Sequence, residues 1–180
     1  MKKLWVTVIL FFVFVFTVKD SLVLAVSEVD SKSPEINSFE LFWPVVAGKV
    51  QGDNLYTLKL FKEKIRGYFI FSVVKKAEYF SFLSTKRLVE YEKLTLVDKD
   101  INNASKTLTA VLNMQRKAMT YLDRAEKEGS NTVETVRIVT NTFNRQLSLL
   151  NSIAIKSDNS QKPAIENAIS SLILMLEELL

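Results

Sequence analysis

The 180-residue chain contains no cysteine and no histidine, and it has only 4 glycines and 3 prolines. Without cysteine or histidine it can form no disulfide, no zinc site with nitrogen or sulfur ligands, and no catalytic centre built on either residue. So few glycines and prolines disfavour an all-β sandwich, which needs many tight turns. These absences favour a helical chain, for which we predict no cofactor, metal site or small-molecule ligand.

Residues 1–25 have the composition of an export signal. Lys2 and Lys3 precede an apolar run over residues 4–18, and a small-residue cleavage site ends at Ala25. As a helix the run would span about 22 Å, less than the roughly 30 Å of a bilayer core, although an extension to residue 26 would be long enough. We therefore predict an extracytoplasmic protein. It is either secreted after cleavage behind Ala25 or anchored to the outer face of the cytoplasmic membrane through residues 4–26.

The charge of the exported part is close to balanced. Without residues 1–25, the chain keeps 21 basic and 19 acidic residues, a net charge of +2. Binding to nucleic acid gains affinity when many basic groups displace counterions from phosphates, and this small excess does not favour it. No nucleic acid partner is expected, and a weak nucleic-acid binder is kept only as an alternative.

The remainder divides into a linker with an aromatic, proline- and glycine-containing segment over residues 26–52 and a helical domain over 53–180. Apolar residues recur at helical spacing in five segments of this domain, 54–66, 72–97, 103–128, 133–156 and from about 163 onward. The first segment is expected to bury an apolar face made of Leu55, Leu58, Leu60, Phe61 and Ile65. Because short turns make successive helices antiparallel, we predict an all-α fold, an antiparallel bundle of four to five helices.

Several helix boundaries are predicted from capping residues. Asp53 is a candidate cap for the first helix and Gly67 its stop, while Ser72 would cap the second helix. Gly129 would end the third helix, and the capping-box pattern over residues 131–134 would start the fourth at once.

Two short motifs match those of penicillin-recognising serine enzymes. Ser72 and Lys75 fit S-x-x-K, and residues 157–159 read S-D-N. The third motif is not present in that form, because Lys106-Thr107 is followed by leucine rather than glycine. Since S-x-x-K arises often by chance and Ser72 is explained as a cap, we predict no enzyme. An enzyme that uses serine and carboxylates is the alternative.

Paired carboxylates occur at Glu90/Glu92 and Glu177/Glu178, but neither pair shares a helix face. Neither therefore indicates a general acid–base couple. We expect these residues on solvated helix faces, with Arg87 and Glu90 forming an exposed pair worth a few tenths of a kcal/mol.

Aromatic residues gather on both sides of the first predicted helix. Such a dense group either packs into the core or forms an exposed contact surface for a partner or a membrane. Both interpretations are open, for Phe39, Phe42, Trp43, Tyr68, Phe69 and Phe71.

Residues 42–94 carry a further pattern, G-D-x-L-Y-x-L-K-x-x-K-E from Gly52 to Glu63, followed by K-A-E at 76–78 and K-R-L-x-E at 86–90. This stretch resembles the bacterial domain of unknown function 5667 family. The resemblance implies an exported helical protein and carries no functional residue over. Together with the leader, it predicts a non-enzymatic envelope interaction or structural module, whose partner is another envelope protein or a second copy of the chain.

Overall fold

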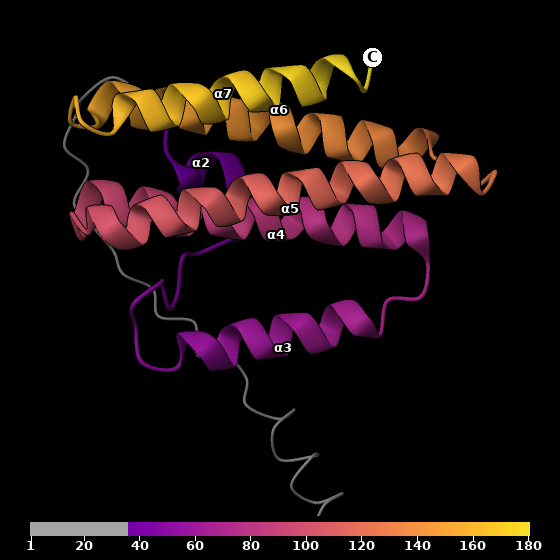
Figure 1. The fold of residues 1–180 in the computed structure, drawn as a ribbon, viewed down its shortest axis with the longest axis horizontal. Helices are drawn as coiled ribbons and strands as arrows, with labels where there is room; N and C mark the ends of the chain where they lie inside the picture. Colours follow the sequence, from indigo (N-terminus) through magenta and orange to yellow (C-terminus); the bar gives the residue numbers. More distant parts are fainter. Residues whose placement is uncertain (1–35) are drawn as a thin grey trace, which may run out of the picture. The chain divides into compact units, whose positions relative to one another are not determined.

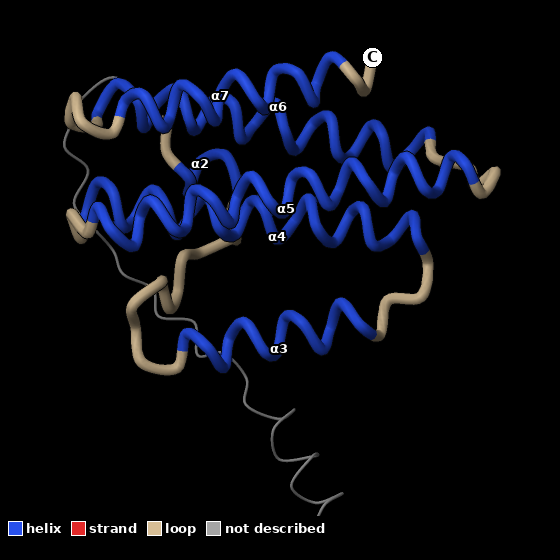
Figure 2. Tube along the Cα trace, viewed as in Figure 1, coloured by secondary structure: helices blue, strands red, loops and turns tan. Residues whose placement is uncertain are grey.

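A computed structural model describes residues 36–180, and the predicted export signal lies outside the described residues. The described part contains six α-helices and no strand, which confirms the all-α class (Figure 2). The helices are α2 (Ser38–Phe42), α3 (Tyr56–Tyr68), α4 (Val73–Glu92), α5 (Ile101–Lys127), α6 (Val133–Lys156) and α7 (Lys162–Glu177), and a π-helical segment, Lys93–Val97, continues α4. Within residues 36–180, no helix combines the length and the apolar character that crossing a bilayer would require.

The helices from α3 onward alternate in direction and form layers (Figure 1). The long helices α4 and α5 lie side by side in the middle, and α6 and α7 cover one side of this pair. The short helix α2 packs against α6 and α4. Helix α3 lies on the opposite side of α4 from α6 and α7.

Two of the predicted helix boundaries are confirmed. The Ser72 hydroxyl accepts a hydrogen bond from the backbone N–H of Lys75 at 3.3 Å, which caps α4. Gly129 follows α5 with a φ of +72°, and the N–H of Ser130 donates to the carbonyl of Ala125 at 2.9 Å, as expected for a left-handed helix end.

Two other predicted boundaries are wrong. The Asp53 carboxylate accepts a hydrogen bond from the N–H of Val50 at 2.8 Å, and α3 begins only after Leu55. Gly67 lies inside α3, where a β-carbon would come within 3.1 Å of the Tyr79 ring. This glycine therefore leaves room for the Tyr79 ring beside α3 instead of ending the helix.

The core lies between α4, α5, α6 and α7. Most residues of their predicted apolar stripes point inward, with Leu88, Val111, Phe143, Leu150 and Ile165 among the fully buried side chains. The predicted stripes and the buried sides of these helices agree because apolar residues at 3.6-residue spacing stay on one side of a helix. Val133 at the start of α6 was also expected inside, but it is 77% exposed.

Helix α3 does not follow this rule, and the prediction that its apolar face is buried is wrong. Its apolar residues are exposed, with the fraction of accessible surface ranging from 36% at Ile65 to 67% at Leu55. The polar side of α3 faces α4 instead, since Tyr56, Lys59 and Glu63 bind side chains of that helix.

Candidate functional site: the outer face of α3

Five charged side chains hold α3 to α4, and we call them the charge clamp: Lys59 and Glu63 from α3, and Lys86, Arg87 and Glu90 from α4. The Arg87 guanidinium binds the carboxylates of both Glu63 and Glu90. Lys86 Nζ lies 2.7 Å from Glu63 Oε1, and Lys59 Nζ lies 2.6 Å from Glu90 Oε1. Three cations and two carboxylates thus alternate across the contact between the helices.

The centre of the charge clamp is shielded from solvent. The side chains of Arg87 and Glu90 are 2% and 0% exposed. The Tyr56 hydroxyl donates to Glu90 Oε2 at 3.0 Å, and the Arg87 guanidinium lies over the Tyr56 ring, 5.6 Å from its centroid. The expectation that Glu90 and its pair with Arg87 are solvated is therefore wrong. The reason is that α3 covers this face of α4 and supplies partners for both charges.

The clamp also fixes the loop before α3. Lys59 Nζ donates to the backbone carbonyls of Ala47 and Lys49, at 2.9 and 2.7 Å. Near the middle of α3, the Tyr79 hydroxyl donates to the carbonyl of Glu63 at 2.7 Å. These contacts fix the rotation of α3 about its axis, so its opposite side faces outward.

Burial shifts the pKa values of groups in this contact. Desolvation by burial, followed by the charge of Glu90, raises the pKa of the Tyr56 hydroxyl, and burial also raises the pKa of Tyr79. Burial lowers the pKa of Lys59, against the opposing effect of Glu90. For Arg87, burial alone would lower the pKa, but Glu90 and Glu63 together raise it.

These shifts predict that stability falls at alkaline pH. The pKa values of Tyr56, Tyr79 and Tyr91 are raised mainly by burial above the ordinary 10.0. The folded state therefore keeps three phenols protonated at pH values where the unfolded chain ionises them. This stabilisation is complete below about pH 10 and is lost as the pH rises through the folded-state values. The lowered pKa of Lys59 acts in the opposite direction just below pH 10.5, but it is one group against three.

Urea unfolding between pH 9 and 11.5 would check this expectation. Tyr56→Phe should make the decline with pH shallower, whereas Tyr68→Phe, at a residue that is 77% exposed, should leave the slope unchanged. A free energy of unfolding that stays constant over this range would contradict the expectation.

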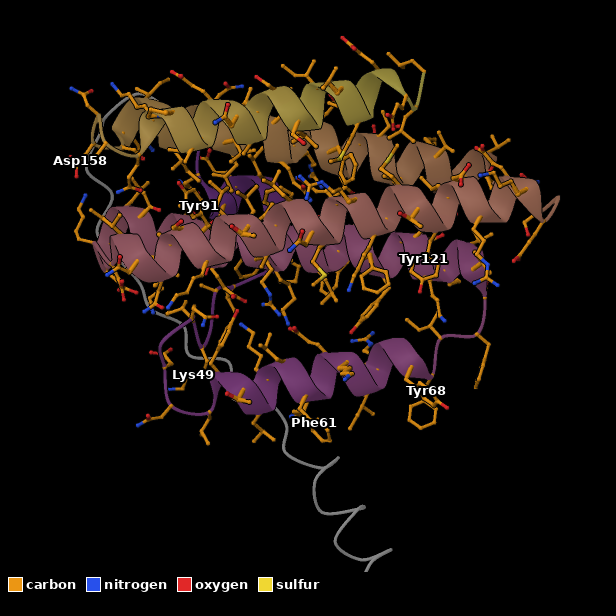
Figure 3. All side chains as sticks on the ribbon, viewed as in Figure 1. Lys49, Phe61, Tyr68, Tyr91, Tyr121 and Asp158 are labelled. Carbon is orange, nitrogen blue, oxygen red and sulfur yellow. The ribbon has the colours of Figure 1, made fainter. Side chains whose placement is uncertain are left out.

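The side of α3 that points away from α4 is apolar, and we call it the outer face. It consists of Leu58, Phe61, Ile65, Tyr68 and Phe69, all exposed. Figure 3 shows Phe61 and Tyr68 directed away from α4 and α5. Three exposed cationic residues, Lys62, Lys64 and Arg66, belong to the same helix.

The six aromatic residues singled out from the sequence are not brought into one cluster. Phe42 is buried in the core, which agrees with the packing interpretation for that residue alone. Phe39 and Trp43 are exposed and contact each other edge to face at 4.7 Å, at helix α2. Tyr68, Phe69 and Phe71 are exposed at and after the C-terminal end of α3, on the other side of α4.

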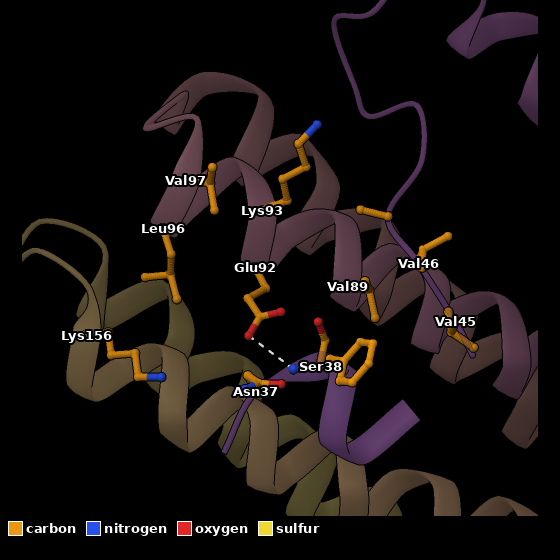
Figure 4. A pocket seen from close by; sticks show the side chains of 12 residues that line it. Asn37, Ser38, Val45, Val46, Val89, Glu92, Lys93, Leu96, Val97 and Lys156 are labelled. Carbon is orange, nitrogen blue, oxygen red and sulfur yellow. Dashed lines mark hydrogen bonds between the residues drawn. The ribbon is translucent and has the colours of Figure 1, made fainter. Parts of the chain in front are cut away.

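A surface pocket of about 450 Å³ lies beside α2 (Figure 4). Its walls include Phe39, Val89 and Leu96 together with Glu92 and Lys93. The Glu92 carboxylate accepts a hydrogen bond from the backbone N–H of Ser38 at 3.3 Å. Glu92 thus ties α2 to α4, which gives this carboxylate a structural role.

The serine motifs have structural roles in the described residues. Ser72 caps α4, and the Lys75 ammonium binds Glu78 at 2.7 Å. The hydroxyl of Ser157 donates to the carbonyl of Ile153 at 2.7 Å. Over residues 36–180, no group of three or more acidic side chains is placed to hold a metal ion.

A second buried polar cluster joins α4, α5 and α6. Gln115 Nε2 donates to Gln146 Oε1 at 2.8 Å, and Gln146 Nε2 donates to Ser84 Oγ at 2.8 Å and to Thr85 Oγ1 at 2.9 Å. Both glutamines are fully buried. Because a buried amide needs partners in specific positions, this cluster fixes how the three helices align.

Sequence reasoning missed the charge clamp and therefore the outer face. One pattern could have shown it, because Tyr56, Lys59 and Glu63 recur at spacings of three and four and form a second stripe opposite the apolar one. Comparisons of the chain with known protein families, with curated proteins and with solved structures give no match.

Proposed function

We propose that this chain is an exported, non-enzymatic interaction module of the cell envelope, folded as an antiparallel bundle of four to five helices, and that α3 presents its contact surface. The exposed apolar outer face of α3 carries this proposal. A surface helix normally turns its apolar stripe toward the core, whereas α3 turns five apolar or aromatic residues outward. Contiguous exposed apolar surface of this kind marks sites of contact with proteins or membranes.

The charge clamp supports the proposal because it holds α3 with its charged side, and not its apolar side, against the protein. Burying Arg87 and Glu90 has a desolvation cost that an apolar contact would not have. Turning α3 by half a turn would bury Leu58, Phe61 and Ile65 instead. If these residues bind a partner, their exposure to solvent in the unbound chain is explained. The composition of the leader over residues 1–25 supports the exported location.

Photo-crosslinking in intact cells that express the full chain would test the proposal. A photoreactive amino acid is placed at Phe61, which is 58% exposed, and as a control at Leu174 on α7, which is 60% exposed. We expect adducts with another protein or with lipid from the Phe61 position and few from Leu174. Unmodified monomer at both positions would contradict the proposed function.

A further inference from the structure

We infer that the outer face of α3 docks on the surface of an anionic lipid bilayer. This inference rests on the proposed function and names its partner. A helix that lies in a membrane interface has one face of apolar and aromatic residues, a polar opposite face, and lysine or arginine beside the apolar face. Helix α3 has all three features, and its apolar face already points away from the protein.

The exposed charges of α3 are all of one sign, although the side that faces α4 holds both a cation, Lys59, and a carboxylate, Glu63. Its one acidic residue, Glu63, is turned into the charge clamp, where it binds Lys86 and Arg87. The exposed charges on the helix, Lys62, Lys64 and Arg66, are all positive. Although the exported part has a net charge of only +2, the exposed charges of α3 itself all attract an anionic surface. Each lysine or arginine near such a surface strengthens binding by roughly fivefold.

This charge pattern disfavours a second copy of the chain as the occupant. A two-fold contact places the same patch of both copies face to face. Two outer faces paired in this way would bring Lys62 and Lys64 of one copy toward those of the other, without exposed acidic residues on α3 to compensate. Arg66 contributes less, because its guanidinium lies over the Tyr79 ring of α4. An anionic bilayer accepts both the apolar stripe and the positive charges beside it.

A further observation fits a membrane surface. The residues at and after the end of α3, Tyr68, Phe69 and Phe71, are aromatic and exposed, and aromatic rings are favoured at the headgroup level.

The absence of cysteine allows a site-specific test with the full chain. A single cysteine is introduced by Phe61→Cys, or by Leu174→Cys as the matched control, and labelled with an environment-sensitive fluorophore. Each labelled chain is mixed with vesicles of phosphatidylcholine alone or with 30% phosphatidylglycerol, both containing a lipid-borne quencher. We expect strong quenching for the Phe61 position in the anionic vesicles, weak quenching in the neutral ones, and little for Leu174 in either.

The charge requirement is tested by two double variants with the same change of net charge. Lys62→Gln with Lys64→Gln should lower the ratio of docked to undocked chain by roughly 25-fold, whereas Lys106→Gln with Lys127→Gln on α5 should change it less than twofold. Circular dichroism checks that each variant is folded. Equal quenching in neutral and anionic vesicles, or none at the Phe61 position, would overturn the inference.

The vesicle assay, read together with the crosslinking experiment in cells, separates this inference from the proposed function. Absence of quenching together with protein adducts at Phe61 in cells would replace the membrane by a protein partner and leave the interaction module standing. Concentration-dependent dimers that are lost on Phe61→Gln, again without quenching, would overturn the membrane inference in favour of a second copy. Absence of both quenching and adducts would overturn both proposals.

Discussion

Replacing Arg87 with alanine is expected to lower the free energy of unfolding by about 3–5 kcal/mol. Arg87 is the central cation of the charge clamp and binds Glu63 and Glu90, whose side chains are 12% and 0% exposed. Without the guanidinium, Glu90 would keep Lys59 and Tyr56 as partners but lose its buried neighbour on α4. A buried charge that loses a partner retains its desolvation cost, and this explains the size of the expected loss.

Urea unfolding of Arg87→Ala and Lys86→Ala would measure this effect. Lys86 is the next residue and also pairs with Glu63, but its side chain is 24% exposed, so we expect a loss of at most about 1 kcal/mol. Arg87→Ala and Lys86→Ala each remove one positive charge from α4. If both cost the same small amount, the charge clamp would not hold α3 to α4.

Replacing Phe143 with alanine is expected to lower the free energy of unfolding by about 3–5 kcal/mol. The Phe143 ring is fully buried between the helices of the core, so its removal loses apolar burial and leaves a cavity. Phe61→Ala removes the same atoms from the outer face of α3 and should change stability by less than about 0.5 kcal/mol. Guanidinium unfolding of both variants measures the difference, and similar losses would contradict the assignment of Phe61 to the surface.

Apolar stripes predict the buried side of the helices correctly on one side of α4 and wrongly on the other. For α4 to α7 the apolar stripe predicted both the helix and its buried side, because apolar neighbours cover these stripes from two directions. For α3 the helix was predicted, but its orientation was wrong. A period of 3.6 residues shows that one side of a helix is apolar, and it does not show what that side faces.

The polar stripe of α3 is visible in the sequence, but its partners on α4 could not be predicted, for a related reason. Glu63 and Arg87 are 24 residues apart and Lys59 and Glu90 are 31 apart, so local pair rules do not connect them. Glu90 was paired correctly with Arg87 at i, i+3, but its burial depends on α3, which covers it. Of the aromatic residues, Phe42 is buried in the core and Tyr68 is exposed. This difference depends on tertiary contacts, and no local sequence pattern predicts it.

The central claim is that α3 is held by its charged side and presents its apolar side to the surroundings. The most direct test is the reaction rate of a single cysteine, introduced by Phe61→Cys in a chain with no other thiol, with a water-soluble thiol reagent under native conditions. We expect a rate within tenfold of that of the unfolded chain, and protection by at least a thousandfold for Phe143→Cys. Strong protection at the Phe61 position in the monomer would show that this face is buried and would contradict the account.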